Sequence, residues 1–147
     1  MSNFFEFVGL NPNTKWLKDA IFYLALSASI PLKILIVLLN PYVKTYPNLS
    51  IYFILFLLFV SFSEELFFRG FLMPVFSSFI KGKSWFFSYS NIIVSFIFSI
   101  SHIFLHNIFW SALVFFPSLI YGYFREKYES ILPPVVLHFV YNLVYFY

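Results

Sequence analysis

Long apolar runs separated by short polar connections make up most of this chain. Runs of about 20 predominantly apolar residues are the length that predicts helices able to cross a bilayer. We expect five helices, at about 16–39, 50–79, 84–105, 108–124 and 132–147. The runs are continuous and do not alternate with polar residues, which in practice excludes a strand-based membrane barrel. The last segment is marginal for spanning, and we expect it to pack against its neighbours.

Three of these segments carry features that bear on their shape. Pro31 is expected to kink the first helix, and Lys33 is expected to extend along it toward Asn40. The second segment is longer than the hydrocarbon core requires, so it should tilt, kink or extend into the headgroups. The prolines at 133–134 suit the first turn of the last helix.

Composition identifies the solvent of these helices. Of the 147 residues, 61% are hydrophobic and only 10% are charged, whereas soluble domains are about 45–50% apolar and about 25% charged. The sequence therefore predicts an all-α fold, a polytopic membrane helix bundle with about five transmembrane or membrane-embedded helices. Its length suits a single domain over 1–147. The chain has no cysteine, which excludes disulfides, thiol catalysis and thiolate metal sites.

The net charge of +3 comes from cations that lie beside the apolar segments, so we interpret them as topology determinants and expect no nucleic-acid partner. Threading the five segments alternately through a lipid bilayer leaves only Lys44 on one side. The cations on the other side are Lys15, Lys18, Lys81, Lys83, Arg125 and Lys127. This asymmetry predicts an integral multi-pass protein with a cytoplasmic N-terminus. We expect the membrane to be that of a prokaryotic cell.

Six polar side chains within the apolar segments need an explanation: Glu64, Glu65, Arg69, His102, His138 and Asn142. Ionisable groups in a membrane face the bundle interior or a wet cavity, so they are functional candidates. Glu65 and Arg69 are four residues apart, which predicts an ion pair on one helix face. Glu64 lies about 100° around the helix without a local partner, as suits a general base. His138 and Asn142 are also four apart and can aim two donors at a developing oxyanion.

Three motifs occur in order on successive predicted helices: EELFFR at 64–69, FSISH at 98–102 and HFVYN at 138–142. They resemble the signatures E-E-x-x-x-R, F-x-x-x-H and H-x-x-x-N/D of the CPBP family. This family comprises the CAAX proteases and bacteriocin-processing enzymes, also called Abi. One motif alone would be weak evidence, but all three in order are a specific signal. The motif-bearing core covers about 50–147.

The resemblance implies a glutamate-dependent intramembrane endopeptidase without a cofactor. Glu64 together with His102 would activate the attacking water. His138 and Asn142 would stabilise the tetrahedral oxyanion. The substrate would be a membrane-associated protein or peptide in the lipid bilayer, cut near its C-terminus, as in CAAX-type, sorting-tail or peptide processing.

The same resemblance implies that Glu65 and Arg69 would hold the second helix and orient the site, and Phe98 would be a further supporting residue. Purely structural interpretations stay open beside these roles. The Glu65–Arg69 pair can serve folding alone, and the histidine and asparagine of the last helix can be an interhelical clamp.

Other functions also remain open. His102 and His106 have the spacing of two zinc ligands, and His138 or Glu64 would complete a catalytic zinc site. Against this, the stretch HIFLH lacks the adjacent glutamate that zinc proteases use as base, and His106 falls at a helix end. A catalytically inactive immunity or membrane scaffold protein would keep the fold without the reaction. A small transporter would also use buried glutamate and histidine, although no inverted repeat is visible.

Overall fold

The computed structural model describes residues 4–39, 49–104 and 108–147. Within them the regular secondary structure is helical except for one short hairpin, which confirms the all-α prediction. The α-helices are α1 (Phe4–Phe7), α2 (Ala20–Ser27), α3 (Ser29–Leu39), α4 (Ile51–Glu65), α5 (Met73–Phe79), α6 (Tyr89–Ser101), α7 (Ile108–Tyr128) and α8 (Leu132–Phe146). The other elements are the 3₁₀ turns η1 (Lys15–Lys18) and η3 (His102–Phe104), the π-helix η2 (Leu66–Leu72), and the strands β1 (Lys83–Ser84) and β2 (Phe87–Ser88).

Three stretches are long and apolar enough to cross a membrane: Ala20–Leu39, Ile51–Phe79 and Ile108–Tyr128. Two shorter apolar helices, Tyr89–Phe104 and Leu132–Phe146, accompany them. The helix α8 is thus short, as the sequence predicts, and it packs against α3, α4 and α7. These helices form a membrane bundle of the expected kind.

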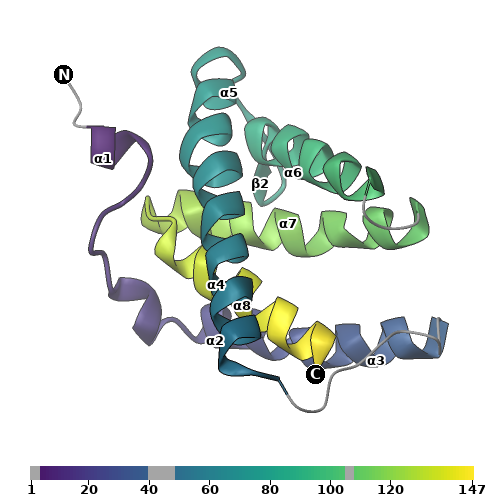
Figure 1. Cartoon of the computed structure of the whole chain (residues 1–147). Coiled ribbons are helices and arrows are strands. Elements are labelled where there is room, and N and C mark those ends of the chain that lie inside the picture. The colour runs from purple at the N-terminus through teal and green to yellow at the C-terminus, as the bar shows by residue number, and fades with distance from the viewer. Residues whose placement is uncertain (1–3, 40–48, 105–107) are drawn as a thin grey trace.

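Figure 1 shows how the elements are arranged. The continuous helix formed by α4, η2 and α5 crosses the other helices, with α6 and α7 lying side by side next to it. Helix α8 lies between α7 and α3 and contacts α4. Two clusters of buried apolar residues fill the contacts between these helices. One comprises Trp16, Phe22, Tyr121, Phe124, Leu137 and Tyr141, and the other comprises Phe68, Met73, Val94 and Phe98.

The helices differ from the prediction at several points. The first segment begins as the 3₁₀ turn η1, and its α-helix starts at Ala20 instead of position 16. The first helix is interrupted at Ala28, because Pro31 has no N–H to bond the carbonyl four residues earlier. The third begins at Tyr89 instead of position 84, because residues 83–88 form the β1–β2 hairpin. Gly82 and Trp85 provide positive φ angles of 107° and 59° for this turn. The fourth extends to Tyr128, one turn beyond the predicted end.

The π-helix η2 follows directly after the two glutamates, a position where such segments are often functional. The N–H of Met73 bonds the carbonyl of Phe68, five residues earlier. In the same register the carbonyl of Arg69 would need the N–H of Pro74, which does not exist. The side chain of Arg125 on α7 supplies the missing donor, with its Nε 3.1 Å from this carbonyl. The π segment is thereby tied to α7.

The same arginine fastens the N-terminal segment to the bundle. Arg125 Nη2 donates to the carbonyl of Phe7 at 3.1 Å. Gly9 has a φ of 75°, and a Cβ atom there would lie only 2.7 Å from the Arg125 guanidinium carbon. A glycine is therefore required where the segment crosses this side chain.

Candidate active site

Glu65 and Arg69 form a fully buried ion pair, as their spacing predicts. Arg69 Nη1 lies 2.9 Å from Glu65 Oε1, and both side chains are 0% exposed. Arg69 Nη2 also donates to the carbonyl of Ser118 on α7 at 2.9 Å. The guanidinium packs on the ring of Phe98, 4.6 Å from its centroid. A buried ion pair needs such additional hydrogen bonds to offset desolvation, so α7 completes a pair that begins within one helix.

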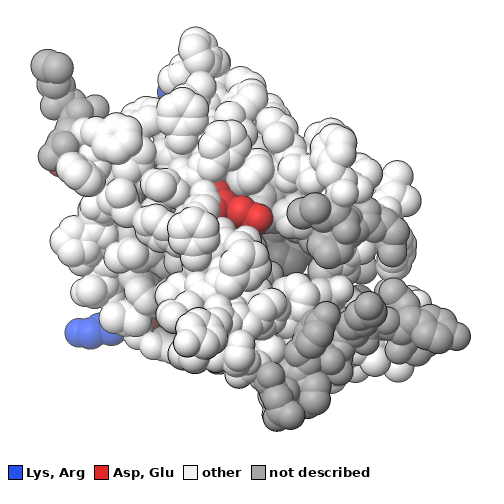
Figure 2. All heavy atoms as spheres, viewed as in Figure 1, with Lys and Arg blue, Asp and Glu red and all other residues white. Residues whose placement is uncertain are grey.

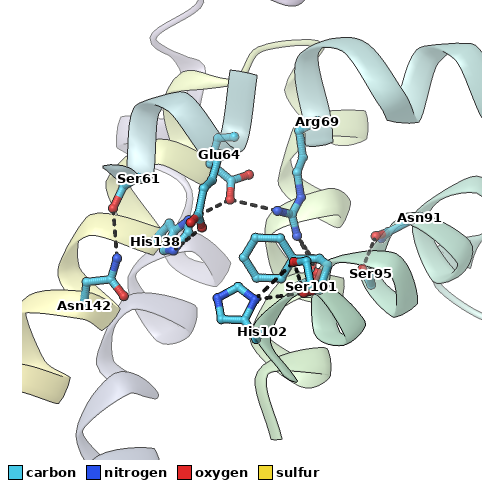
Figure 3. Close-up of polar contacts among 12 residues, drawn as sticks. Ser61, Glu64, Arg69, Asn91, Ser95, Ser101, His102, His138 and Asn142 are labelled. Atoms are coloured by element: carbon cyan, nitrogen blue, oxygen red, sulfur yellow. Dashed lines mark hydrogen bonds and ion pairs between the residues drawn. The ribbon is translucent and has the colours of Figure 1, made fainter. Parts of the chain in front are cut away.

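His138 lies between the two glutamates. Its Nδ1 is 2.8 Å from Glu65 Oε1, and its Nε2 is 3.6 Å from Glu64 Oε2. A carboxylate only accepts hydrogen bonds, so Nδ1 carries a proton and donates it to Glu65. Tyr121 stacks on the ring with 5.1 Å between centroids and an angle of 18°. Figure 3 shows His138 beside Glu64, with Asn142 to one side and Arg69 to the other.

Glu64 is the accessible carboxylate of the pair. Its side chain is 31% exposed, whereas that of Glu65 is fully buried. Figure 2 shows an acidic group in a hollow of an otherwise largely uncharged face, over the helix that carries Glu64. Its Oε2 atom is nevertheless buried, and no described residue forms a hydrogen bond with it. Unused hydrogen-bonding capacity at a buried atom marks a place where a polar reactant can bind.

Phe98 and His102 lie one helical turn apart on the third predicted segment. His102 Nδ1 lies 2.8 Å from the Phe98 carbonyl, which fixes Nδ1 as the donor and orients the ring. The Phe98 ring contacts both imidazoles, at 4.5 Å from His102 and 5.7 Å from His138 between centroids. Phe98 thus brings the second and third motifs together around one aromatic ring.

Asn142 lies one turn after His138 on α8 and reaches α4. Its Nδ2 donates to Ser61 Oγ at 3.2 Å, and Ser61 is completely buried. An amide nitrogen carries two hydrogens, so one donor remains beyond the contact with Ser61. Asn142 is therefore oriented by α4, the same helix that carries Glu64.

A cavity of about 100 Å³ lies beside these side chains, between α3, α7 and α8. One water needs about 10–15 Å³ of such volume, so several waters fit. Its polar and aromatic lining includes Lys33, Phe98, His102, Tyr121, His138 and Asn142. Water can therefore reach three of the four residues for which the resemblance implies a catalytic role, namely His102, His138 and Asn142.

The described residues contain no group of three or more histidine, aspartate or glutamate side chains that could hold a metal ion. His106, the second histidine of the zinc alternative, lies outside the described residues.

Ser61, Ser118 and Tyr121 contribute to the site, but the sequence alone did not identify them. Ser61 lies three residues before Glu64, a spacing that shares a helix face and could have revealed it. Ser118 and Tyr121 are likewise three apart on the fourth segment, as a polar pair within an apolar run. No spacing indicates, however, that α7 packs against Arg69 and His138.

One comparison with known proteins identifies the family. A family model described as type II CAAX prenyl endopeptidase Rce1-like matches residues 46–144, which is 99 of the 147 residues and includes all three motifs. Comparisons with curated proteins and with solved structures gave no match. A match over most of the chain, on helices of the expected kind, shows that the chain belongs to the Rce1-like CAAX prenyl endopeptidase family.

Proposed function

We propose that this chain is a glutamate-dependent intramembrane endopeptidase. Its reaction is the hydrolysis of a peptide bond near the C-terminus of a membrane-associated protein or peptide. The observation that carries the proposal is the position of Glu64 Oε2, buried without a hydrogen-bond partner in the described part of the chain and 3.6 Å from His138 Nε2. Membership of a family of prenyl endopeptidases supports this class of reaction.

In the first step, Glu64 acts as the general base. Its Oε2, 3.6 Å from His138 Nε2, accepts a hydrogen bond from a water that enters from the cavity lined by His138 and His102, and His102 helps to orient that water. As the water oxygen attacks the carbonyl carbon, one O–H bond breaks and Glu64 takes the proton. The product is a tetrahedral oxyanion, with no covalent link to the enzyme.

His138 and Asn142 then stabilise the oxyanion. With a proton on Nε2 as well as Nδ1, His138 is a cation whose charge balances Glu64, while Arg69 balances Glu65. A buried cluster without net charge is the favourable arrangement. The second amide hydrogen of Asn142 is the other donor, so two donors from one helix meet the developing charge.

The collapse of the tetrahedral intermediate completes the reaction. Its carbon–nitrogen bond breaks, the oxyanion becomes a carboxylic acid, and Glu64 returns its proton to the leaving amine. Glu65 and Arg69 take no part in proton transfer. Glu65 holds the His138 ring in place through the 2.8 Å contact to Nδ1, and Arg69 holds Glu65, which makes both of them positioning residues.

The proposal is tested with Glu64→Gln. This change keeps the size of the side chain and removes the base, so cleavage should fall by about 10²- to 10⁴-fold while the protein accumulates in the membrane as before. Glu129→Gln, the same change at an exposed position, is the matched control. The readout is mass spectrometry of C-terminal peptides from the membrane and secreted proteins of cells that carry each variant.

A protein that gains an uncut C-terminal segment only with Glu64→Gln would identify the substrate. If the Glu64→Gln and wild-type chains yield the same set of C-termini, the proposal fails and a non-catalytic immunity or scaffold role is favoured. The activity of the wild-type chain, measured on any substrate found in this way, also distinguishes these two functions.

A further inference from the structure

A lysine lines the same cavity at some distance from the glutamates. Lys33 lies on α3, within the apolar stretch Ala20–Leu39. Its Nζ donates to the carbonyl of Tyr145 near the end of α8 and lies 5.4 Å from the centre of the Tyr145 ring. Across the described residues, no carboxylate forms an ion pair with Lys33. A half-buried cation in an apolar stretch is costly and marks a candidate site for an anion.

The chemistry around Lys33 favours one kind of anion. Its ammonium group has three donors, and the Tyr145 carbonyl uses one of them. The neighbouring lining is apolar and aromatic, including Leu32, Ile36 and Trp110. An apolar peptide in such a cavity carries one unavoidable negative charge, the carboxylate at its C-terminus. Among the described residues that line the cavity, Lys33 is the only lysine or arginine.

The distance along α8 relates this cation to the proposed site of cleavage. Tyr145 follows His138 by seven residues, which at about 1.5 Å per residue is about 10 Å. An extended peptide covers about 3.3–3.6 Å per residue, so about three residues fit between the two positions. Asn142 lies between them on the same helix, and Trp110 stacks on Tyr145 with centroids 4.5 Å apart.

We propose that Lys33 is a specificity-determining residue that binds the C-terminal carboxylate of the substrate. Its ammonium group then sets the distance between the free terminus and the bond that is cut. The inference rests on the proposed function, because it assumes that the bond is hydrolysed beside Glu64. It predicts that a substrate with an uncharged C-terminus is a poor one.

The first test compares two forms of the same substrate. Synthetic peptides with apolar C-terminal residues are made as free acids and as C-terminal amides, and their cleavage by the full chain is followed in liposomes. The wild-type chain should cleave the acids about 10- to 100-fold faster than the amides, the range expected for a hydrogen-bonded charge pair. Lys33→Met should slow cleavage of the acids to the rate of the amides, and Lys33→Arg should keep most of the preference.

Each outcome has a distinct meaning. Equal cleavage of acids and amides by the wild-type chain, or a preference that survives Lys33→Met, overturns the inference and leaves the proposed function intact. If the wild-type chain cleaves neither form, the proposed function fails, and the inference fails with it. Lys18→Met, a change of the same chemistry at an exposed position outside the cavity, should keep the wild-type preference.

A second test does not depend on turnover. In the Glu64→Gln background, the tripeptide Val-Leu-Ala is added as the acid or as the amide, and the fluorescence of Trp110 reports binding in the cavity. The acid should bind about tenfold or more tightly than the amide, and Lys33→Met should remove the difference. Trp110→Phe should remove the signal. Far-ultraviolet circular dichroism checks that each variant is folded, and equal affinity for acid and amide in the Glu64→Gln chain overturns the inference.

Discussion

Two regions of the molecule bury polar side chains between helices in different ways. The α6–α7 seam consists of Asn91, Ser95, Ser99, Ser111 and Gly122, and the glutamate cluster consists of Glu64, Glu65, Arg69 and His138. In the seam, Asn91 Nδ2 donates to the Leu119 carbonyl at 3.0 Å, and Ser95 Oγ donates to Asn91 Oδ1 at 3.1 Å. In the glutamate cluster, three buried atoms have no hydrogen-bond partner among the described residues: Glu64 Oε2, Glu65 Oε2 and Arg69 Nε.

The difference separates a structural use of polar groups from a functional one. The seam uses neutral groups whose hydrogen bonds hold two helices at close approach, and such groups contribute to folding. The glutamate cluster uses charges, which are expensive in a membrane, and leaves part of their bonding capacity unused. Substitutions in the seam should therefore reduce stability and leave the activity of the folded protein normal, whereas substitutions at Glu64 should reduce activity. Breaking the fully buried Glu65–Arg69 pair should also reduce stability, because it leaves a charge without its partner.

Arg69→Met is expected to have the largest effect on stability. It would leave the carboxylate of Glu65 fully buried without its cation, and loss of one partner of a buried pair costs about 3–5 kcal/mol. We expect a large drop in the midpoint of denaturant unfolding in detergent and little protein in the membrane. The double variant Arg69→Met/Glu65→Met removes both charges and should recover part of the stability. A single variant as stable as the wild-type chain would show that the pair does not support the fold.

Gly122→Ala is expected to have the next largest effect on stability, and it tests the packing of the α6–α7 seam. A Cβ atom at this position would lie 1.9 Å from Asn91 Oδ1, so the buried amide would have to move and give up its hydrogen bonds. Overpacking of this kind costs about 1–3 kcal/mol. Unfolding in detergent should show the loss, and cleavage by the folded fraction should stay normal.

The double variant Gly122→Ala/Asn91→Ala is the control for this clash. Removing the amide makes room for the new methyl group, so the two substitutions should cost less together than the sum of each alone. Additive losses in stability would mean that the clash with Asn91 is not the cause.

Ser61→Ala tests the supporting shell of the glutamate cluster. Asn142 would lose the acceptor that orients its amide, a contact of 3.2 Å. A neutral hydrogen bond is worth about 1 kcal/mol, so we expect cleavage to fall about fivefold with little change in unfolding. Ser63→Ala is the matched control, since it removes a hydroxyl from the same helix beside Glu64. Equal activity of the two variants would exclude a positioning role for Ser61.

The sequence predicts best the features that depend on neighbouring residues. The ion pair between Glu65 and Arg69 follows from a spacing of four on one helix, and the structure contains it. The apolar runs likewise predict the helices, because in a membrane each helix satisfies its own backbone hydrogen bonds. The π segment was not predicted, because its pattern of apolar residues does not differ from that of the α-helices on either side of it. Pro74, which has no N–H to donate, follows the segment but lies beyond the motif.

Contacts between distant segments could not be predicted in the same way. His138 bridges two glutamates 73 and 74 positions earlier in the chain, and only the docking of α8 on α4 brings them together. The spacing of His138 and Asn142 indicated a shared face but not that Glu65 would hold Nδ1. The contact across the seam also joins residues far apart in the sequence, because Asn91 and Gly122 meet only through the packing of α6 on α7.

A contact at the ends of two spanning segments, where Asp19 meets Lys127, should have the smallest effect on stability. Asp19 caps α2 by accepting from the Ile21 N–H at 2.9 Å, and its other oxygen lies 2.6 Å from Lys127 Nζ. The hydrogen bonds from Lys127 and Tyr128 hold the pKa of Asp19 below its ordinary value of 3.8. A lowered pKa in the folded state means that this stabilisation is present above pH 3.8 and is lost as the pH falls through the lowered pKa.

Asp19→Asn keeps the cap but removes the charge, so it should cost about 0.5 kcal/mol at pH 7 and less as the pH falls below about 4. Unfolding in detergent at several pH values measures the difference, and added salt should reduce it because water screens the pair. Parallel pH profiles for the two chains would show that the carboxylate contributes nothing through its charge. Water can solvate Asp19 when Lys127 is absent, whereas the fully buried Glu65 relies on Arg69 to compensate its charge. The same type of ion pair should therefore be dispensable at the surface and essential within the bundle.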